Sequence, residues 1–175
     1  MMKLKWIITD ELYGITATEY DTEWNGICGF AKMAIDKDEI GWMPEDDLLR
    51  PEEGDYDILY ILGELLDSIL VTNKRDKKII MLLTHNLAEI TVERNETDYL
   101  ICLCNTENNS VIWEHYVACE EFVSVIVDAA NSFLDEIQKI NADLKKTRDI
   151  KRLIENLYSI CNDIDTAVIQ KGNIP

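Results

Sequence analysis

Basic side chains are scarce in this sequence. Its 175 residues include 17 Lys and Arg against 34 Asp and Glu, which gives a formal net charge of −17 at pH 7. So acidic a surface repels the phosphates of nucleic acids and of anionic membranes. We therefore expect a protein that binds neither nucleic acid nor a membrane surface.

Long apolar runs are also missing. The apolar run near the start, Trp6-Ile7-Ile8, has three residues, whereas a signal peptide needs roughly 7 to 15 and a membrane span roughly 20. The five cysteines, an odd number, are Cys28, Cys102, Cys104, Cys119 and Cys161. Because no export signal accompanies them, we expect reduced thiols and a cytoplasmic location.

The rest of the composition is typical of a folded protein. Hydrophobic residues make up 47% of the chain. A chain of this length buries about 70% of its unfolded surface on folding, which is enough for a core. We expect a single domain over residues 1–175.

The first 35 residues predict β-structure. Residues 4–8 and 13–17 each alternate apolar with polar side chains, which is typical of strands. Asn25-Gly26 then predicts a hairpin turn between residues 20–24 and 27–35, because both turn positions tolerate positive φ.

Residues 36–57 carry almost half of the net charge. Ten Asp and Glu against two Lys and Arg give this segment a charge of −8, and it holds two of the three prolines. Long loops inside compact domains are uncommon and often functional. We therefore predict an acidic surface loop over 36–57.

The middle of the chain predicts a helix followed by strands. Residues 55–72 are apolar on more than one side, which indicates a buried helix with Asp55 as its N-cap. Four strand candidates joined by short polar turns follow, an arrangement typical of an antiparallel meander. They are residues 78–84, 87–94, 99–105 and 111–117.

The C-terminal third predicts helices. Residues 119–171 contain neither Gly nor Pro, and their apolar residues recur every three or four positions. A break near 145–149 would give helices over about 119–145 and 149–170, with 146–175 as a helical extension; one long bent helix is the alternative. The predicted fold is thus α+β, with a largely antiparallel sheet of about six to seven strands, a buried helix and two C-terminal helices.

The sequence gives little support for a metal site or for reactive cysteines. Asp36, Asp38 and Gly41 are placed as in a calcium loop, but Ile40 stands where the fifth position needs an oxygen ligand. Cys102-x-Cys104 lies inside an apolar strand candidate, where cysteine commonly packs as a small core residue. We therefore expect no metal site.

The spacing of the candidate catalytic residues does not indicate an active site either. His85 and His115 would serve Cys28 as a base only if the fold brought them together, and no spacing shows that it does. We expect neither a cofactor nor enzymatic activity.

A short basic stretch precedes the last helix. It contains Lys145, Lys146, Arg148, Lys151 and Arg152. We expect these cations to pair with acidic surface of the same chain or of a second copy. The apolar stripes of the two C-terminal helices would also allow a homodimer.

Short matches to a known group of proteins run along residues 3–140. They are Trp6, Thr9, Asp10, Tyr13 and Ile15 near the start, Glu93-Arg94-Asn95 and Trp113 in the strand meander, and Phe122 with Asn131-Ser132-Phe133-Leu134 in the next helix. With the order of predicted elements, they resemble the small acidic immunity proteins of bacterial polymorphic-toxin and contact-dependent inhibition systems. The tail after about residue 145 looks like an addition.

The resemblance implies a protein that binds a cognate toxin and neutralises it by occlusion. Many such toxins are basic nucleases, which an acidic inhibitor attracts. We expect the contact surface in the acidic loop, with Trp42 as apolar anchor. Its residues are Asp36, Asp38, Glu39, Trp42, Glu45, Asp46, Asp47, Glu52 and Glu53. The alternative is a small cytoplasmic ligand-binding protein, or an enzyme with its site in a pocket beside the sheet.

Overall fold

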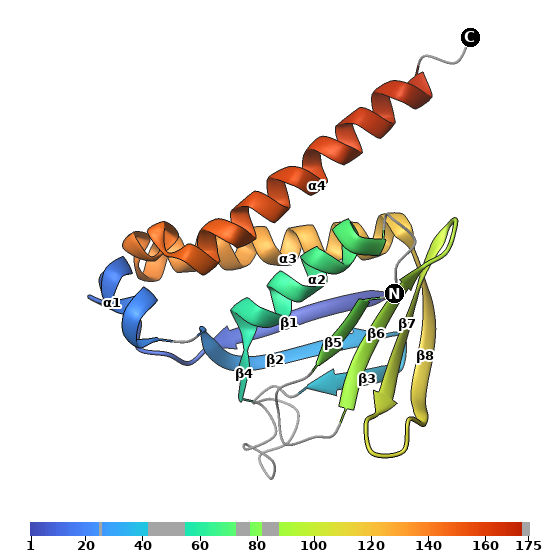
Figure 1. Cartoon of the computed structure of the whole chain (residues 1–175), viewed down its shortest axis with the longest axis horizontal. Helices are drawn as coiled ribbons and strands as arrows, with labels where there is room; N and C mark the ends of the chain where they lie inside the picture. The colour runs from blue at the N-terminus through green and yellow to red at the C-terminus, as the bar shows by residue number, and fades with distance from the viewer. Residues whose placement is uncertain (25, 42–54, 73–77, 82–87, 173–175) are drawn as a thin grey trace.

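Helices lie above two sheets in this fold (Figure 1). The computed structural model describes residues 1–24, 26–41, 55–72, 78–81 and 88–172. These residues form four α-helices and two antiparallel sheets of four strands each. The predicted α+β class is therefore confirmed, although two sheets with eight strands replace the single sheet of six to seven.

The first sheet is built around its second strand. β1 (Met2–Ile8) pairs along its whole length with β2 (Cys28–Ile35). The other edge of β2 pairs with β3 (Asp38–Gly41) and β4 (Asp55–Asp57). The segment 36–57, which we predicted as a loop, therefore has a strand near each end, because both ends satisfy their backbone hydrogen bonds on β2.

Residues 17–23 form a helix instead of part of the predicted strand. Helix α1 (Ala17–Glu23) begins with a capping box: the Glu19 amide donates to Thr16 Oγ1 at 3.2 Å, and the Thr16 amide donates to Glu19 Oε2 at 2.8 Å. These bonds satisfy amides that a helix start otherwise leaves without partners. The predicted hairpin at Asn25-Gly26 is wrong as well, since α1 lies between β1 and β2, although Gly26 has a φ of 109°.

The predicted buried helix is confirmed, with a different cap. Helix α2 (Ile58–Thr72) starts after Asp57, whose Oδ1 accepts a hydrogen bond from the Tyr60 amide at 2.9 Å. Asp57 rather than Asp55 is therefore the capping side chain. The buried apolar residues of α2 are Ile58, Leu59, Leu62, Leu65, Leu66 and Ile69.

The second sheet is the predicted meander. Its order is β5 (Lys78–Met81), β6 (Ala88–Arg94), β7 (Asp98–Asn105) and β8 (Val111–Ala118). The inner face of this sheet lies toward α2 and α3. The buried side chains of that face are Ile80, Ile90, Val92, Tyr99, Ile101, Leu103 and Val117. The Tyr99 ring stacks on Phe122 of α3 with centroids 4.2 Å apart.

Two C-terminal helices are confirmed, but the interruption between them comes earlier in the chain than predicted. Helix α3 (Cys119–Ile140) ends at Asn141, a short 3-10 turn (Ala142–Lys146) follows, and α4 spans Arg148–Gly172. The Asn141 amide group causes the break, because its Nδ2 donates to the carbonyls of Leu12 at 2.8 Å and Ile15 at 2.7 Å. None of the described helices is both long and apolar enough to cross a membrane.

The last helix is partly core and partly projecting. Its first half buries Ile150, Leu153, Leu157 and Ile160, and its later half runs away from the sheets toward the C-terminus (Figure 1). Its first amide, that of Arg148, donates to Asp21 Oδ1 of α1 at 3.0 Å. The predicted extension therefore contributes to the core near its start.

Candidate functional site

Only a part of the predicted contact surface can be placed. Asp36, Asp38 and Glu39 lie at the turn between β2 and β3. The other six predicted residues fall outside the described residues: Trp42, Glu45, Asp46, Asp47, Glu52 and Glu53.

The three placed acids, which we call the hairpin acids, have partners within the chain. Asp36 accepts a hydrogen bond from the N-terminal ammonium of Met1. Asp38 Oδ2 is 2.9 Å from His115 Nε2 of β8, and Glu39 Oε2 is 2.6 Å from Lys32 Nζ of β2. The hydrogen bond from the ammonium lowers the pKa of Asp36. Asp36 and Asp38 thus hold the β2–β3 turn against the N-terminus and β8, and Glu39 links β3 to β2.

A second acidic surface, not predicted from the sequence, lies on the outer face of the second sheet. Paired strand residues share a face, and alternate residues repeat it. The register places Ile79 opposite Thr91, Thr91 opposite Cys102, and Cys102 opposite Glu114. The neighbouring row holds Glu93, Leu100 and Tyr116. We call this surface the outer face, and Glu89, Glu93 and Glu114 its carboxylates.

Large apolar side chains on the outer face are exposed to solvent. Ile79 is 50% exposed, Val111, which pairs with Cys104, is 53% exposed, and Tyr116 is 65% exposed. Most apolar surface of the same sheet is buried on its inner face. Ile79 stands on the edge strand β5 and Tyr116 on the opposite edge strand β8, with the buried Thr91 and Cys102 on the two strands between them. At the β8 edge, exposed apolar side chains beside carboxylates form a candidate interaction site.

The outer-face carboxylates differ from the hairpin acids. Within the described part of the chain, the side-chain carboxylates of Glu89, Glu93 and Glu114 form no hydrogen bond and no ion pair. Their charge is therefore available to cations from another molecule.

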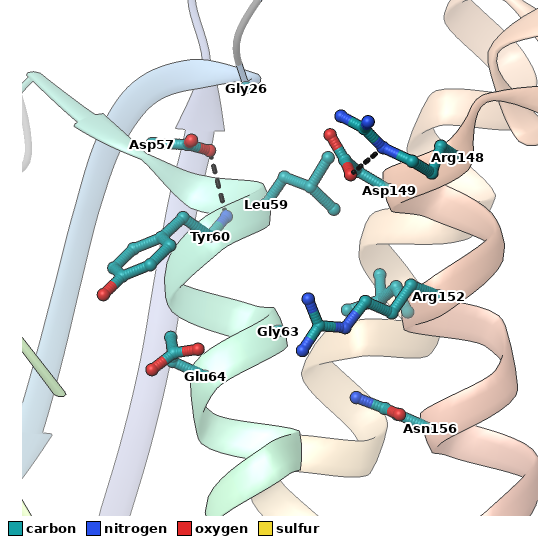
Figure 2. A pocket seen from close by; sticks show the side chains of 11 residues that line it. Gly26, Asp57, Leu59, Tyr60, Gly63, Glu64, Arg148, Asp149, Arg152 and Asn156 are labelled. Carbon is teal, nitrogen blue, oxygen red and sulfur yellow. Dashed lines mark hydrogen bonds and ion pairs between the residues drawn. The ribbon is translucent and has the colours of Figure 1, made fainter. Parts of the chain in front are cut away.

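A cleft separates the first half of α4 from α2 (Figure 2). Its volume is about 420 Å³. It is lined by Gly26, Asp57, Leu59, Tyr60, Gly63, Glu64, Arg148, Asp149, Arg152, Leu153 and Asn156. The size falls within the range of small-molecule sites, about 300–1,000 Å³.

Burial alters the acid–base properties beside this cleft. Desolvation raises the pKa of Asp57, although backbone amides, including those of Tyr60 and Ile27, partly offset it. Burial, with the charges of Asp57 and Asp149 nearby, also raises the pKa of the Tyr20 hydroxyl. That hydroxyl has no partner at hydrogen-bonding geometry among the described residues, although the Gly26 backbone lies near enough to favour its ionised form slightly.

Metal ligands and thiols do not gather. Among the described residues, no group of three His, Cys, Asp or Glu side chains could hold a metal ion. His115 contacts Asp38 rather than a cysteine, and His85 lies outside the described residues. Comparisons with protein-family models, curated proteins and solved structures found no match to this chain.

Proposed function

We propose that this chain is an immunity protein that binds a basic toxin and blocks it by occlusion. The observation that carries the proposal is the outer face: exposed apolar side chains surrounded by carboxylates without partners in the described chain. The overall charge of −17 supports it, as does the sequence resemblance to immunity proteins.

The outer face has the two components that a protein interface needs. Tyr116 on β8 offers large apolar surface at little cost in side-chain entropy, and tyrosines are frequent interface hot spots. Glu93 and Glu114 lie on the same face and would meet Lys or Arg of the partner at the rim.

Charge also sets the rate of encounter. A net charge of −17 attracts a basic partner over distances of about a Debye length, roughly 8–10 Å at physiological salt, and raises the association rate. Carboxylates would then occupy positions on the toxin where a phosphate substrate would bind. The mechanism is stoichiometric, because each bound chain covers one toxin molecule.

The test uses the reading frame that neighbours this gene. Its C-terminal domain is expressed in a bacterial host with and without this chain, and growth is measured. We expect the domain to arrest growth, the chain to restore it, and the two proteins to co-purify as a complex. A matched chain with Glu93→Lys and Glu114→Lys should restore growth less well.

Either of two results would overturn the proposal. The first is a neighbouring domain that does not impair growth. The second is growth arrest that this chain, present as soluble folded protein, does not relieve. The predicted homodimer through the C-terminal helices is a separate prediction, which sedimentation of the isolated chain would test.

A further inference from the structure

The basic stretch before α4 is not neutralised as a whole. Lys146 Nζ forms an ion pair with Asp143 at 2.6 Å, and Arg148 Nε is 3.3 Å from Asp149 Oδ1. Arg152, in contrast, makes no hydrogen bond or ion pair with any described residue. Arg152 is exposed, so its guanidinium is open to a ligand from solution.

Arg152 belongs to a row of donors along the cleft. Arg148, Arg152 and Asn156 are spaced by four residues, which places them on one side of α4. All three line the cleft, and Figure 2 shows the Arg152 guanidinium extending from α4 toward α2. The donors of Arg152 and Asn156 are therefore neighbours on the wall that faces α2.

The opposite wall holds a glycine that packing does not require. Gly63 lies within α2, where glycine destabilises a helix relative to alanine. A Cβ atom added there would meet no other atom within 4 Å. Gly63 therefore leaves the space across from Arg152 open, as Figure 2 shows.

The charged side chains that line the cleft determine how much negative charge a ligand can carry. Asp57, Glu64 and Asp149 also line the cleft and repel anions, the more strongly the more negative charges the anion carries, so a single carboxylate is opposed least. A single carboxylate matches the planar fork of one guanidinium, which donates two parallel hydrogen bonds. Leu59 and Leu153, both buried, offer apolar surface to the rest of the ligand.

We propose that the cleft between α2 and α4 binds a small organic monocarboxylate, whose carboxylate accepts hydrogen bonds from Arg152 and Asn156 across from Gly63. Its apolar part rests on Leu59 and Leu153. This site lies on different elements from the outer face, so the proposal stands or falls independently of the proposed toxin partner.

The test titrates the full-length chain with benzoate, followed by calorimetry and by amide chemical shifts. We expect saturable binding with a millimolar or lower Kd, and weaker binding of phosphate and citrate at equal ionic strength. Arg152→Gln should weaken benzoate binding at least tenfold. Gly63→Met, which fills the open wall, should weaken it similarly while the circular dichroism spectrum stays unchanged.

The matched control is Lys151→Gln, which removes an exposed cation from the next position of α4 without touching the cleft. It should leave the benzoate Kd unchanged. The proposal is overturned if benzoate does not bind saturably, if phosphate binds more tightly than benzoate, or if Lys151→Gln weakens binding as much as Arg152→Gln. Should Gly63→Met prove misfolded, the Arg152→Gln and Lys151→Gln pair still decides the outcome.

Discussion

The hairpin acids and the outer-face carboxylates are both exposed or half-buried acids on β-structure, yet they differ in their partners. Asp36, Asp38 and Glu39 contact an ammonium, an imidazole and a lysine of the same chain. The carboxylates of Glu89, Glu93 and Glu114 form no hydrogen bond or ion pair with any described residue. The difference teaches that a high local density of acids does not by itself identify a binding surface.

Acids with internal partners serve the fold, and acids without them are available to a partner molecule. A surface carboxylate already paired with a cation of its own chain carries less unbalanced charge, so a second cation gains less from contacting it. The predictions that follow test whether the two acidic groups separate stability from binding in this way.

Charge reversal on the outer face should have the largest effect. Glu93→Lys with Glu114→Lys should weaken binding of the neighbouring toxin domain by roughly a hundredfold, because two attractive charge pairs become repulsive. Calorimetry measures the Kd. The control is Glu11→Lys with Glu155→Lys, which changes the net charge equally at exposed positions away from the outer face. Equal weakening by both pairs would show that only the overall charge matters.

Removal of the apolar anchor should have the next largest effect. Tyr116→Ser should weaken the complex by roughly thirtyfold, in keeping with a hot-spot loss of about 2 kcal/mol. Its side chain is 65% exposed, so urea denaturation should detect little change in the free energy of unfolding. A large loss of stability would mean that Tyr116 serves the fold instead.

A third kind of acid, Asp57, caps a helix and should affect stability rather than toxin binding. Asp57→Ala should lower the free energy of unfolding by about 1 kcal/mol, and Asp57→Asn should not, because asparagine caps equally well. Burial raises the pKa of Asp57 in the folded state. The wild-type chain should therefore lose stability as pH rises through that pKa, and Asp57→Asn should lack this loss. Urea denaturation at pH 4 and pH 7 measures both effects.

The smallest effect should come from the hairpin acids. The pKa of Asp36 is lowered in the folded state, so its contribution to stability is present at neutral pH and disappears as pH falls through that pKa. Asp36→Asn should therefore lower the thermal midpoint slightly at pH 7 and by less as the pH is lowered toward 3, with the toxin Kd unchanged. Glu107→Gln, at an exposed acid in the β7–β8 turn, is the control. A weaker toxin complex for Asp36→Asn would contradict the distinction between the hairpin acids and the outer-face carboxylates.

Much of the fold follows from burial patterns in the sequence. Helix α2, strands β6 to β8 and the two C-terminal helices were predicted because each buries apolar residues with a regular period. Helix α1 was missed although its signal, Thr16 followed by Glu19, is present in the sequence. The break at Asn141 depends on carbonyls more than 120 positions away, which local patterns do not contain.

The outer face was also beyond sequence reasoning. Glu93, Leu100 and Tyr116 come from three strands, and only the register of the sheet makes them neighbours. The alternation of Glu89, Thr91 and Glu93 with apolar residues does indicate a polar outer side for β6 alone. Arg152 belongs to a basic stretch that the sequence shows, but the cleft that it faces exists only once α4 packs beside α2.

The central claim is that the outer face, rather than the hairpin acids, contacts the partner. Amide hydrogen exchange of this chain with and without the neighbouring toxin domain tests it directly, because β8 is an edge strand whose outward amides exchange readily. We expect slower exchange over Val111–Ala118 in the complex and unchanged exchange over residues 36–39. Slower exchange at residues 36–39 with Val111–Ala118 unchanged would contradict the account.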